Sequence, residues 1–156
     1  MGYCMYIEDQ EFLIRGKNKA GALAAIKGLD PNGTDSSSAR LQGGRWDGEK
    51  QAKVERWFSW VDTKEYQDAE TLEDALRAWR WPSDPQGVEP TEDVDHIAFD
   101  GEKIGNEEVL FDAIAPFVES GSFIEMHGED GCQWRWLFRN GKCYEIYPEL
   151  TWPEPS

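Results

Sequence analysis

Residues 132–147, CQWRWLFRNGKCYEIY, carry the strongest local fold signal in the chain. The dipeptide Asn140-Gly141 separates two runs rich in aromatic and branched side chains. It is the preferred centre of a two-residue type I′ hairpin turn, because both of its positions need a positive φ. A loop of two residues fixes the strand register, which places Phe138 opposite Cys143. Together with a strand predicted over residues 122–127, this hairpin predicts a C-terminal β-meander.

Apolar side chains recur at helical spacing in three segments upstream of the meander. The first helix is predicted over Lys17–Lys27, the second from Thr71 to the residues before Pro82, and the third from Asn106, with a break at Pro116. Each apolar helix stripe needs an apolar sheet face to pack against. We therefore expect an α+β fold: a mixed, largely antiparallel sheet with about three helices packed on one face, ending in the β-meander.

Other segments carry weaker strand and loop signals. Clustered Gly, Ser and Pro predict a mobile loop over about residues 30–47, and several prolines among acidic residues predict a connector over about 82–93. The whole chain, residues 1–156, is expected to form a single domain that contains both segments. Strands are predicted at Tyr3–Glu8, Glu11–Arg15, Trp57–Val61 and His96–Phe99, and a short helix at Lys50–Arg56.

The composition limits the class of protein. A chain of 156 residues can bury a sizeable core, and an aromatic content of 13% with eight Trp is too high for a disordered acidic tail. Three widely spaced cysteines favour reduced thiols over a disulfide framework. No apolar run is long enough for a membrane span and no leader-peptide pattern is present. These features predict a cytoplasmic protein.

Acidic residues are unevenly distributed along the chain. The formal net charge is −15, from 31 Asp and Glu against 16 Lys and Arg. Residues 84–130 alone contain fourteen Asp and Glu and a single basic residue, Lys103. A field of this sign repels nucleic acids and anionic membranes and attracts basic protein surfaces. We therefore expect the partner to be a basic protein surface, that of a nucleic acid-binding protein, with no direct contact to nucleic acid or membrane.

Five carboxylates of the acidic segment are the candidate binding residues. Carboxylates in a row at about phosphate spacing could occupy a basic DNA or RNA channel, because the cations that neutralise phosphates also neutralise carboxylates. The other interpretation is a solvated face that keeps a small protein in solution. The five are expected to lie along one strand–turn–helix edge: Glu102, Glu107, Glu108, Asp112 and Glu119.

The aromatic hairpin offers an alternative site. Trp134, Arg135, Trp136 and Arg139 could together stack on a nucleotide-like signal and hold its phosphate. The competing interpretation is that the Trp face is the core beneath the helices. Eight Trp exceed what a core of this size needs, so some are expected at the surface. The candidates for exposure are the two that precede a proline, Trp81 and Trp152.

No pattern in the chain predicts catalysis, a metal or a cofactor. The run from His127 to Cys132 contains four metal-ligating residue types, but it is more typical of a polar hairpin turn than of a zinc site. Glu125 and Glu145 could form a carboxylate pair beside the Trp residues, which is the basis of a third hypothesis, a small hydrolase. Nucleotide-binding loops and nucleophile motifs are absent. We therefore expect a non-enzymatic protein with no metal and no cofactor.

Residues 121–131, GSFIEMHGEDG, followed by Trp134-Arg135-Trp136, resemble a group of small acidic proteins of phages and mobile elements. Residues 58–62 and 105–117 fit the same group, so the resemblance covers most of the chain. It implies an accessory gene product of the host cytoplasm, and many such proteins antagonise host defence. The leading hypothesis is a non-enzymatic inhibitor of a host defence or nucleic acid-handling complex that acts by nucleic acid mimicry. The alternative is a protein that sequesters a nucleotide-like signal in an aromatic pocket.

Overall fold

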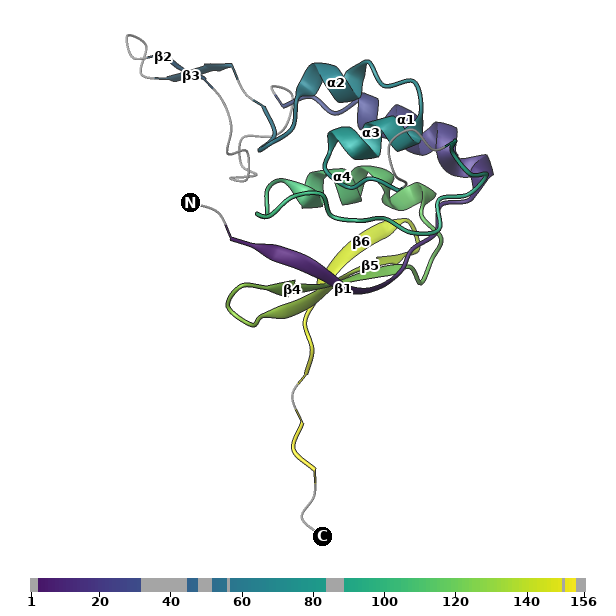
Figure 1. Cartoon of the computed structure of the whole chain (residues 1–156), viewed down its shortest axis with the longest axis vertical. Coiled ribbons are helices and arrows are strands. Elements are labelled where there is room, and N and C mark those ends of the chain that lie inside the picture. Colours follow the sequence, from purple (N-terminus) through teal and green to yellow (C-terminus); the bar gives the residue numbers. More distant parts are fainter. Residues whose placement is uncertain are drawn as a thin grey trace.

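A four-stranded antiparallel sheet forms one layer of the structure (Figure 1). The computed structural model describes residues 3–31, 45–47, 52–55, 57–83, 89–149 and 151–153. All three strand pairings are antiparallel, and the order across the sheet is β1-β4-β5-β6. The strands are β1 (Met5–Glu11), β4 (Phe123–Gly128), β5 (Gln133–Arg139) and β6 (Lys142–Ile146).

Short helices cover one face of this sheet (Figure 1). The predicted α+β fold with helices on one face is therefore confirmed. One α-helix, α2, is additional to those expected from the sequence, and the side chain of Asp62 caps it by accepting from the N–H groups of Lys64 and Glu65. The helices are α1 (Lys19–Lys27), α2 (Thr63–Gln67), α3 (Leu72–Ala78) and α4 (Glu107–Ile114), with 3-10 turns η1 (Gly16–Asn18) and η2 (Ala115–Phe117).

The β5–β6 hairpin forms in the predicted register. Phe138 pairs with Cys143, and the pairs further from the turn follow in order. Asn140 and Gly141 have φ values of 52° and 79°, as a type I′ turn requires. The turn therefore determines which side chains of β6 share a face with those of β5.

Replacing Gly141 by Ala is expected to lower the free energy of unfolding by about 1–2 kcal/mol, the cost of a left-handed conformation for a residue with a Cβ. The nearest contact of that Cβ would be the Cα of Pro116 at 3.8 Å, so the effect is conformational rather than steric. Urea unfolding measures the loss. The control, Asn140→Gly, should leave stability almost unchanged, and an equally stable Gly141→Ala variant would contradict the turn assignment.

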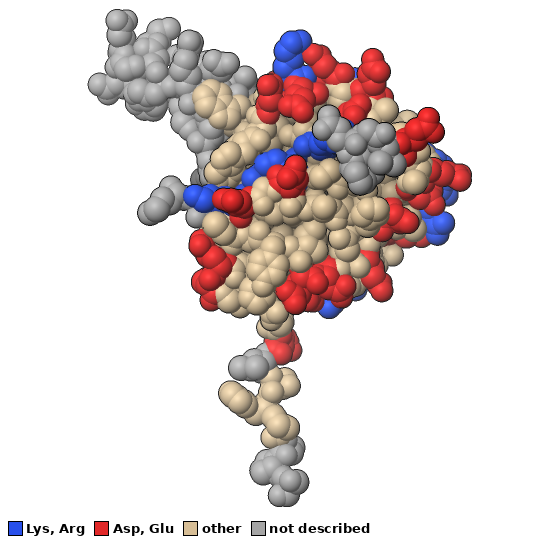
Figure 2. Space-filling model, viewed as in Figure 1, with Lys and Arg blue, Asp and Glu red and all other residues tan. Residues whose placement is uncertain are grey.

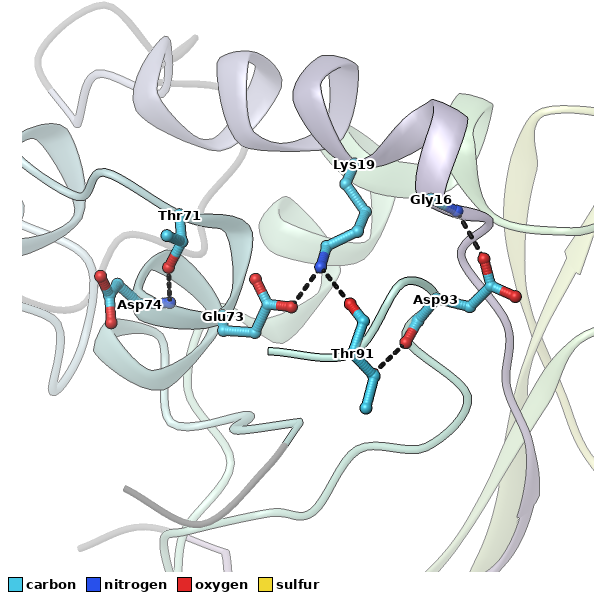
Figure 3. Close-up of polar contacts among 7 residues, drawn as sticks. All are labelled: Gly16, Lys19, Thr71, Glu73, Asp74, Thr91 and Asp93. Atoms are coloured by element: carbon cyan, nitrogen blue, oxygen red, sulfur yellow. Dashed lines mark hydrogen bonds and ion pairs between the residues drawn. The ribbon is translucent and has the colours of Figure 1, made fainter. Parts of the chain in front are cut away.

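The predicted ends of the longer helices also form. Thr71 Oγ1 accepts a hydrogen bond of 3.1 Å from the Asp74 N–H at the start of α3 (Figure 3). Pro116 ends the regular helix as expected, because α4 stops at Ile114 and the chain continues as the 3-10 turn η2. Gly28 is the C-cap of α1. Local capping chemistry therefore accounts for these boundaries.

The core lies between the sheet and the helices. Trp134, Trp136 and Phe138 of β5 point into it, alternating with less buried residues. Trp81 is fully buried, with its ring centroid 5.0 Å from that of Phe111 and 5.9 Å from that of Trp136. The prediction that Trp81 is exposed is therefore wrong.

Four of the strand predictions are corrected by the structure. Tyr3–Glu8 and Glu11–Arg15 are not two separate strands, because the chain continues through a bulge between Ile7 and Asp9 as the single strand β1. Residues 57–61 and 96–99 are not strands. The first ends in a turn, and the second lies as irregular chain beside the segment after α3. Phe58, Val61 and Ile97 are buried without belonging to a strand, so aromatic and branched content does not indicate sheet pairing here.

The predicted loop and short helix before residue 57 are replaced in part by a small hairpin. It consists of β2 (Arg45–Asp47) and β3 (Ala52–Glu55), which pair antiparallel. The predicted helix over Lys50–Arg56 is therefore wrong, and residues 45–47 do not belong to a loop. Residues 32–44 of the predicted loop lie outside the described residues.

Residues 89–93 of the acidic connector are held against the helical layer (Figure 3). Lys19 of α1 forms an ion pair with Glu73 of α3 and donates a hydrogen bond of 2.8 Å to the Thr91 carbonyl. Asp93 accepts a hydrogen bond of 2.7 Å from the Gly16 N–H. This part of the connector therefore belongs to the folded domain, whereas residues 84–88 lie outside the described residues.

Candidate binding face

Glu107 is buried, so the prediction that it belongs to an exposed acidic surface is wrong. Its two carboxylate oxygens lie 2.8 and 3.0 Å from Nη2 of Arg80, and it accepts a hydrogen bond of 2.6 Å from the Gly105 N–H. Burial raises the pKa of Glu107, and the charge of Arg80 opposes that shift. The carboxylate therefore serves a buried ion pair inside the fold.

The Arg80 guanidinium is packed from several directions. It lies 5.0 Å from the ring centroid of Trp60 and 5.1 Å from that of Phe99, and its Nη1 donates a hydrogen bond of 2.9 Å to the Lys103 carbonyl. A Cβ on Gly101 would lie 2.9 Å from Nη1, so a glycine there lets the backbone approach the cation. Arg80 itself has a positive φ of 74°. These contacts make Arg80 a structural residue.

The other four predicted acidic residues differ in exposure and in their partners. Glu102, Asp112 and Glu119 are exposed and Glu108 is half-buried, and Glu119 lies 3.7 Å from Arg15. Figure 2 shows Asp and Glu distributed around the visible face and interrupted by Lys and Arg. The expected edge of five exposed carboxylates is therefore not formed, because Glu107 is buried and Glu108 is half-buried.

The aromatic stacking platform is also not available. Trp134 and Trp136 are 4% and 3% exposed and face the helices, which confirms the core interpretation. Arg135 and Arg139 are exposed and alternate with the buried residues, so they lie on the opposite face. The four residues predicted to hold a nucleotide-like ligand therefore do not share one surface.

The carboxylate pair of the hydrolase hypothesis does not come together. Glu125 pairs across the sheet with Arg135, whereas Glu145 pairs with Trp136 and so lies on the other face. In the part of the chain that the structure describes, no group of three or more His, Cys, Asp or Glu could hold a metal ion. The same residues contain no helix with the length and apolarity that a membrane span needs. Cys4, Cys132 and Cys143 are free thiols.

The face of the sheet opposite the helices, here called the outer face, is not covered by any described helix or strand (Figure 1). Toward β5 and β6 it combines aromatic and aliphatic side chains with the bases Arg135, Arg139 and Lys142, and toward β1 it is acidic. Apolar side chains left exposed and bordered by charge are typical of a protein-binding surface. The outer face consists of Tyr6, Asp9, Glu11, Phe123, Glu125, His127, Gln133, Arg135, Leu137, Arg139, Lys142, Tyr144 and Ile146.

Contacts within the outer face hold several of its side chains in place. Arg135 Nε donates a hydrogen bond of 2.8 Å to Glu125, and the guanidinium lies 4.3 Å from the ring centroid of Phe123. Tyr6 stacks on His127 with 5.1 Å between ring centroids. Side chains that are already ordered lose less conformational entropy on binding. These side chains would therefore lose little conformational entropy if another molecule bound to the face.

A pocket of about 310 Å³ lies at the β5–β6 end of the sheet. Apolar groups of Ile146 and Pro148 line it together with the polar pair of Glu125 and Arg135. A pocket of this size and mixed chemistry fits an anchoring side chain of a protein partner. Its full lining is Glu125, Gln133, Trp134, Arg135, Ile146, Tyr147 and Pro148.

No protein-family model, curated protein or solved structure matches this chain. The resemblance to small acidic proteins of phages and mobile elements therefore stays a prediction, and the site is argued from its geometry.

The acidic site predicted in residues 84–130 does not include the contribution of β1. Asp9 and Glu11 lie on the outer face because β1 pairs with β4, which places them opposite Glu125 and Phe123. The usable signal was the acidic character of residues 8–11. This signal was missed because the two predicted strands, Tyr3–Glu8 and Glu11–Arg15, left Asp9 outside any strand, whereas β1 includes it.

Proposed function

We propose that this is a non-enzymatic binding protein that docks its outer face on a basic surface of a protein partner. The observation that carries the proposal is an uncovered, partly aromatic sheet face with an acidic border. Among the described residues, no Lys or Arg lies within ion-pair distance of Asp9 or Glu11 on that border. Such carboxylates can be neutralised by a partner without breaking an internal ion pair.

The charge balance of the whole chain supports a basic partner. Some basic side chains already form ion pairs within the fold, since Arg80 pairs with Glu107 and Lys19 pairs with Glu73. With 31 acidic residues against 16 basic ones, one-to-one pairing would still leave 15 carboxylates without a base. The resulting field accelerates encounter with positively charged surfaces.

Within this class, the proposed partner is a nucleic acid-binding protein of the host cell. Its basic channel would receive carboxylates in place of phosphates, and the bound protein would then act as an inhibitor. The sign and size of the net charge support this assignment, and the resemblance to phage proteins fits it. Competition with DNA separates this partner from other basic proteins.

Charge reversal on the acidic border is expected to weaken binding. Core histones serve as the basic nucleic acid-binding probe, and binding is measured by fluorescence anisotropy at several salt concentrations. The dissociation constant should rise at least about tenfold between 50 and 200 mM salt, and duplex DNA should compete. The double variant Asp9→Lys, Glu11→Lys should weaken binding about tenfold at the lower salt concentration.

The matched control is Glu65→Lys combined with Glu70→Lys. Both residues are exposed in the helical layer, and the change in net charge is the same. If the outer face is the contact surface, this control should lose much less affinity than the β1 variant. Equal losses, or binding that salt does not weaken, would contradict the proposal.

A further inference from the structure

The two edges of the sheet are built differently. At the β1 edge, Met5 N–H donates a hydrogen bond of 2.8 Å to the Glu102 carbonyl, and Ile104 N–H donates one of 2.7 Å to the Tyr3 carbonyl. A neighbouring segment therefore occupies part of that edge. In the described part of the chain, no backbone hydrogen bond reaches β6 from outside the sheet. Open strand edges are sites at which another chain can add a strand.

The free backbone groups of β6 follow from the hydrogen bonds of β5. Phe138 donates its N–H to the Ser122 carbonyl at 2.8 Å and accepts from the Gly121 N–H at 2.7 Å. Both groups of Phe138 thus point away from β6, so Phe138 and Cys143 form a pair without hydrogen bonds. Cys143 then directs its own N–H and C=O outward, and because the pattern alternates, Glu145 does the same.

The side chains beside these free groups define what can bind there. Tyr144 and Ile146 lie on the outer face and are 44% and 40% exposed. Glu145 lies on the other face, where α4 contributes Asp112. Burial, followed by the charges of Asp112 and Glu145, raises the pKa of the Cys143 thiol to about 12. An added strand would therefore meet apolar groups on one side and negative charge on the other.

We propose that β6 accepts an extended segment of the partner as a fifth strand of the sheet. Backbone hydrogen bonds to Cys143 and Glu145 would hold the segment, and its alternating side chains would provide specificity. Residues next to Glu145 would be Lys or Arg, and those next to Tyr144 and Ile146 would be aliphatic or aromatic. The inference rests on the proposed function, because it describes how a basic partner is bound.

A second copy of this chain is a poorer occupant of the same edge. Each copy carries a formal charge of −15, so self-association brings two negative bodies together. Pairing β6 with another β6 would also add further carboxylates beside Glu145 without a cation to neutralise it. A segment that alternates basic and apolar residues relieves this repulsion. Charge complementarity therefore selects a different protein.

The probe is the octapeptide acetyl-(Lys-Val)4-amide, added to the isotope-labelled full chain. Amide chemical shifts should change mainly over residues 142–147, and hydrogen exchange should slow at the amides of Cys143 and Glu145. Two control peptides carry N-methyl groups either on every Lys or on every Val amide. Only the amides that face β6 donate to it, so one control should bind like the parent and the other at least about tenfold more weakly.

Two variants of Glu145 distinguish the contribution of its backbone N–H to peptide binding from the contribution of its side-chain charge. Glu145→Pro removes the outward N–H without removing a hydrogen bond to β5, and it should abolish the shift pattern. Glu145→Gln keeps the N–H and should retain the pattern with weaker, less salt-dependent binding. Circular dichroism and melting temperature report whether each variant folds. If Glu145→Pro does not fold, the N-methylated peptides still decide the question.

The outcomes distinguish this inference from the proposed function. Equal affinity for all three peptides, or shifts spread over other strands, would overturn strand addition while histone binding persists. If the protein binds histones but does not bind the peptide, strand addition at β6 is also wrong. If the unmodified protein does not bind histones at all, the proposed function itself is wrong. A dimer that Glu145→Pro dissociates would show that a second copy occupies β6, and the choice of a basic partner would then be wrong.

Discussion

Replacing Arg80 by Ala is expected to lower the free energy of unfolding by about 3–5 kcal/mol, because it leaves the Glu107 carboxylate buried without its cation. The side chains of Arg80 and Glu107 are 12% and 1% exposed. Water therefore cannot take the place of the lost partner unless the site opens. Urea unfolding at neutral pH measures the change.

The loss of stability in Arg80→Ala is also expected to depend on pH. Burial already raises the pKa of Glu107 against the opposing charge of Arg80, so removing that charge raises it further. When the pKa of an acid is higher in the folded than in the unfolded state, stability increases as the pH falls through the interval between the two values. The destabilisation should therefore be largest at neutral and alkaline pH and shrink as Glu107 becomes protonated.

Two further variants test this explanation. Arg80→Ala combined with Glu107→Gln removes the buried charge, so it should lose the pH dependence and keep only the loss of packing. Lys64→Ala breaks an exposed pair with Asp68 at the end of α2, whose side chains are 84% and 64% exposed, and should leave the free energy of unfolding almost unchanged. A similar loss of unfolding free energy in Lys64→Ala and Arg80→Ala would show that the buried ion pair contributes no more to stability than an exposed one.

Trp81→Ala is expected to lower the free energy of unfolding by about 3–5 kcal/mol, the cost of a large cavity in the core. Its ring contacts the rings of Phe99, Phe111 and Trp136, so the cavity would lie where the sheet meets the helices. Chemical denaturation gives the free energy, and near-ultraviolet circular dichroism should show weaker aromatic signals in the folded variant.

Trp152→Ala is a control matched in local sequence, because each of the two Trp residues precedes a proline. Trp152 is 82% exposed, so its removal should change stability by about 0.5 kcal/mol or less. Equal stability of Trp81→Ala and Trp152→Ala would contradict this prediction, because it would mean that the core around Trp81 is loosely packed.

The meander and the longer helices could be predicted because short-range chemistry determines them. Asn140-Gly141 fixed both the turn and the register, Thr71 marked the start of α3, and Pro116 marked the end of α4. Each of these features depends on residues within one or two turns of the chain. The α+β class followed from the same features, since apolar helices and an apolar sheet face require one another.

The candidate site could not be predicted in the same way, because long-range contacts decide it. Glu107 has the sequence position of an exposed acidic residue at a helix start. It is buried instead, where it forms an ion pair with Arg80, which lies 27 positions earlier in the chain. Trp81 and Trp152 have the same local context and opposite exposure. The acidic border of the outer face depends on the pairing of β1 with β4, which no local pattern indicates.

That pairing also sets the order of events during synthesis of the chain. Met5 pairs with Gly128, so 123 positions separate the partners. A ribosome that adds about 5–20 residues per second needs roughly 6–25 s to cover that interval. During that time the first strand has no partner and lies among other newly made chains. The negative charges of Glu8, Asp9 and Glu11 disfavour strand pairing between β1 and other newly made chains during this interval. Asp9 and Glu11 would therefore limit aggregation of the nascent chain before they form part of the outer face.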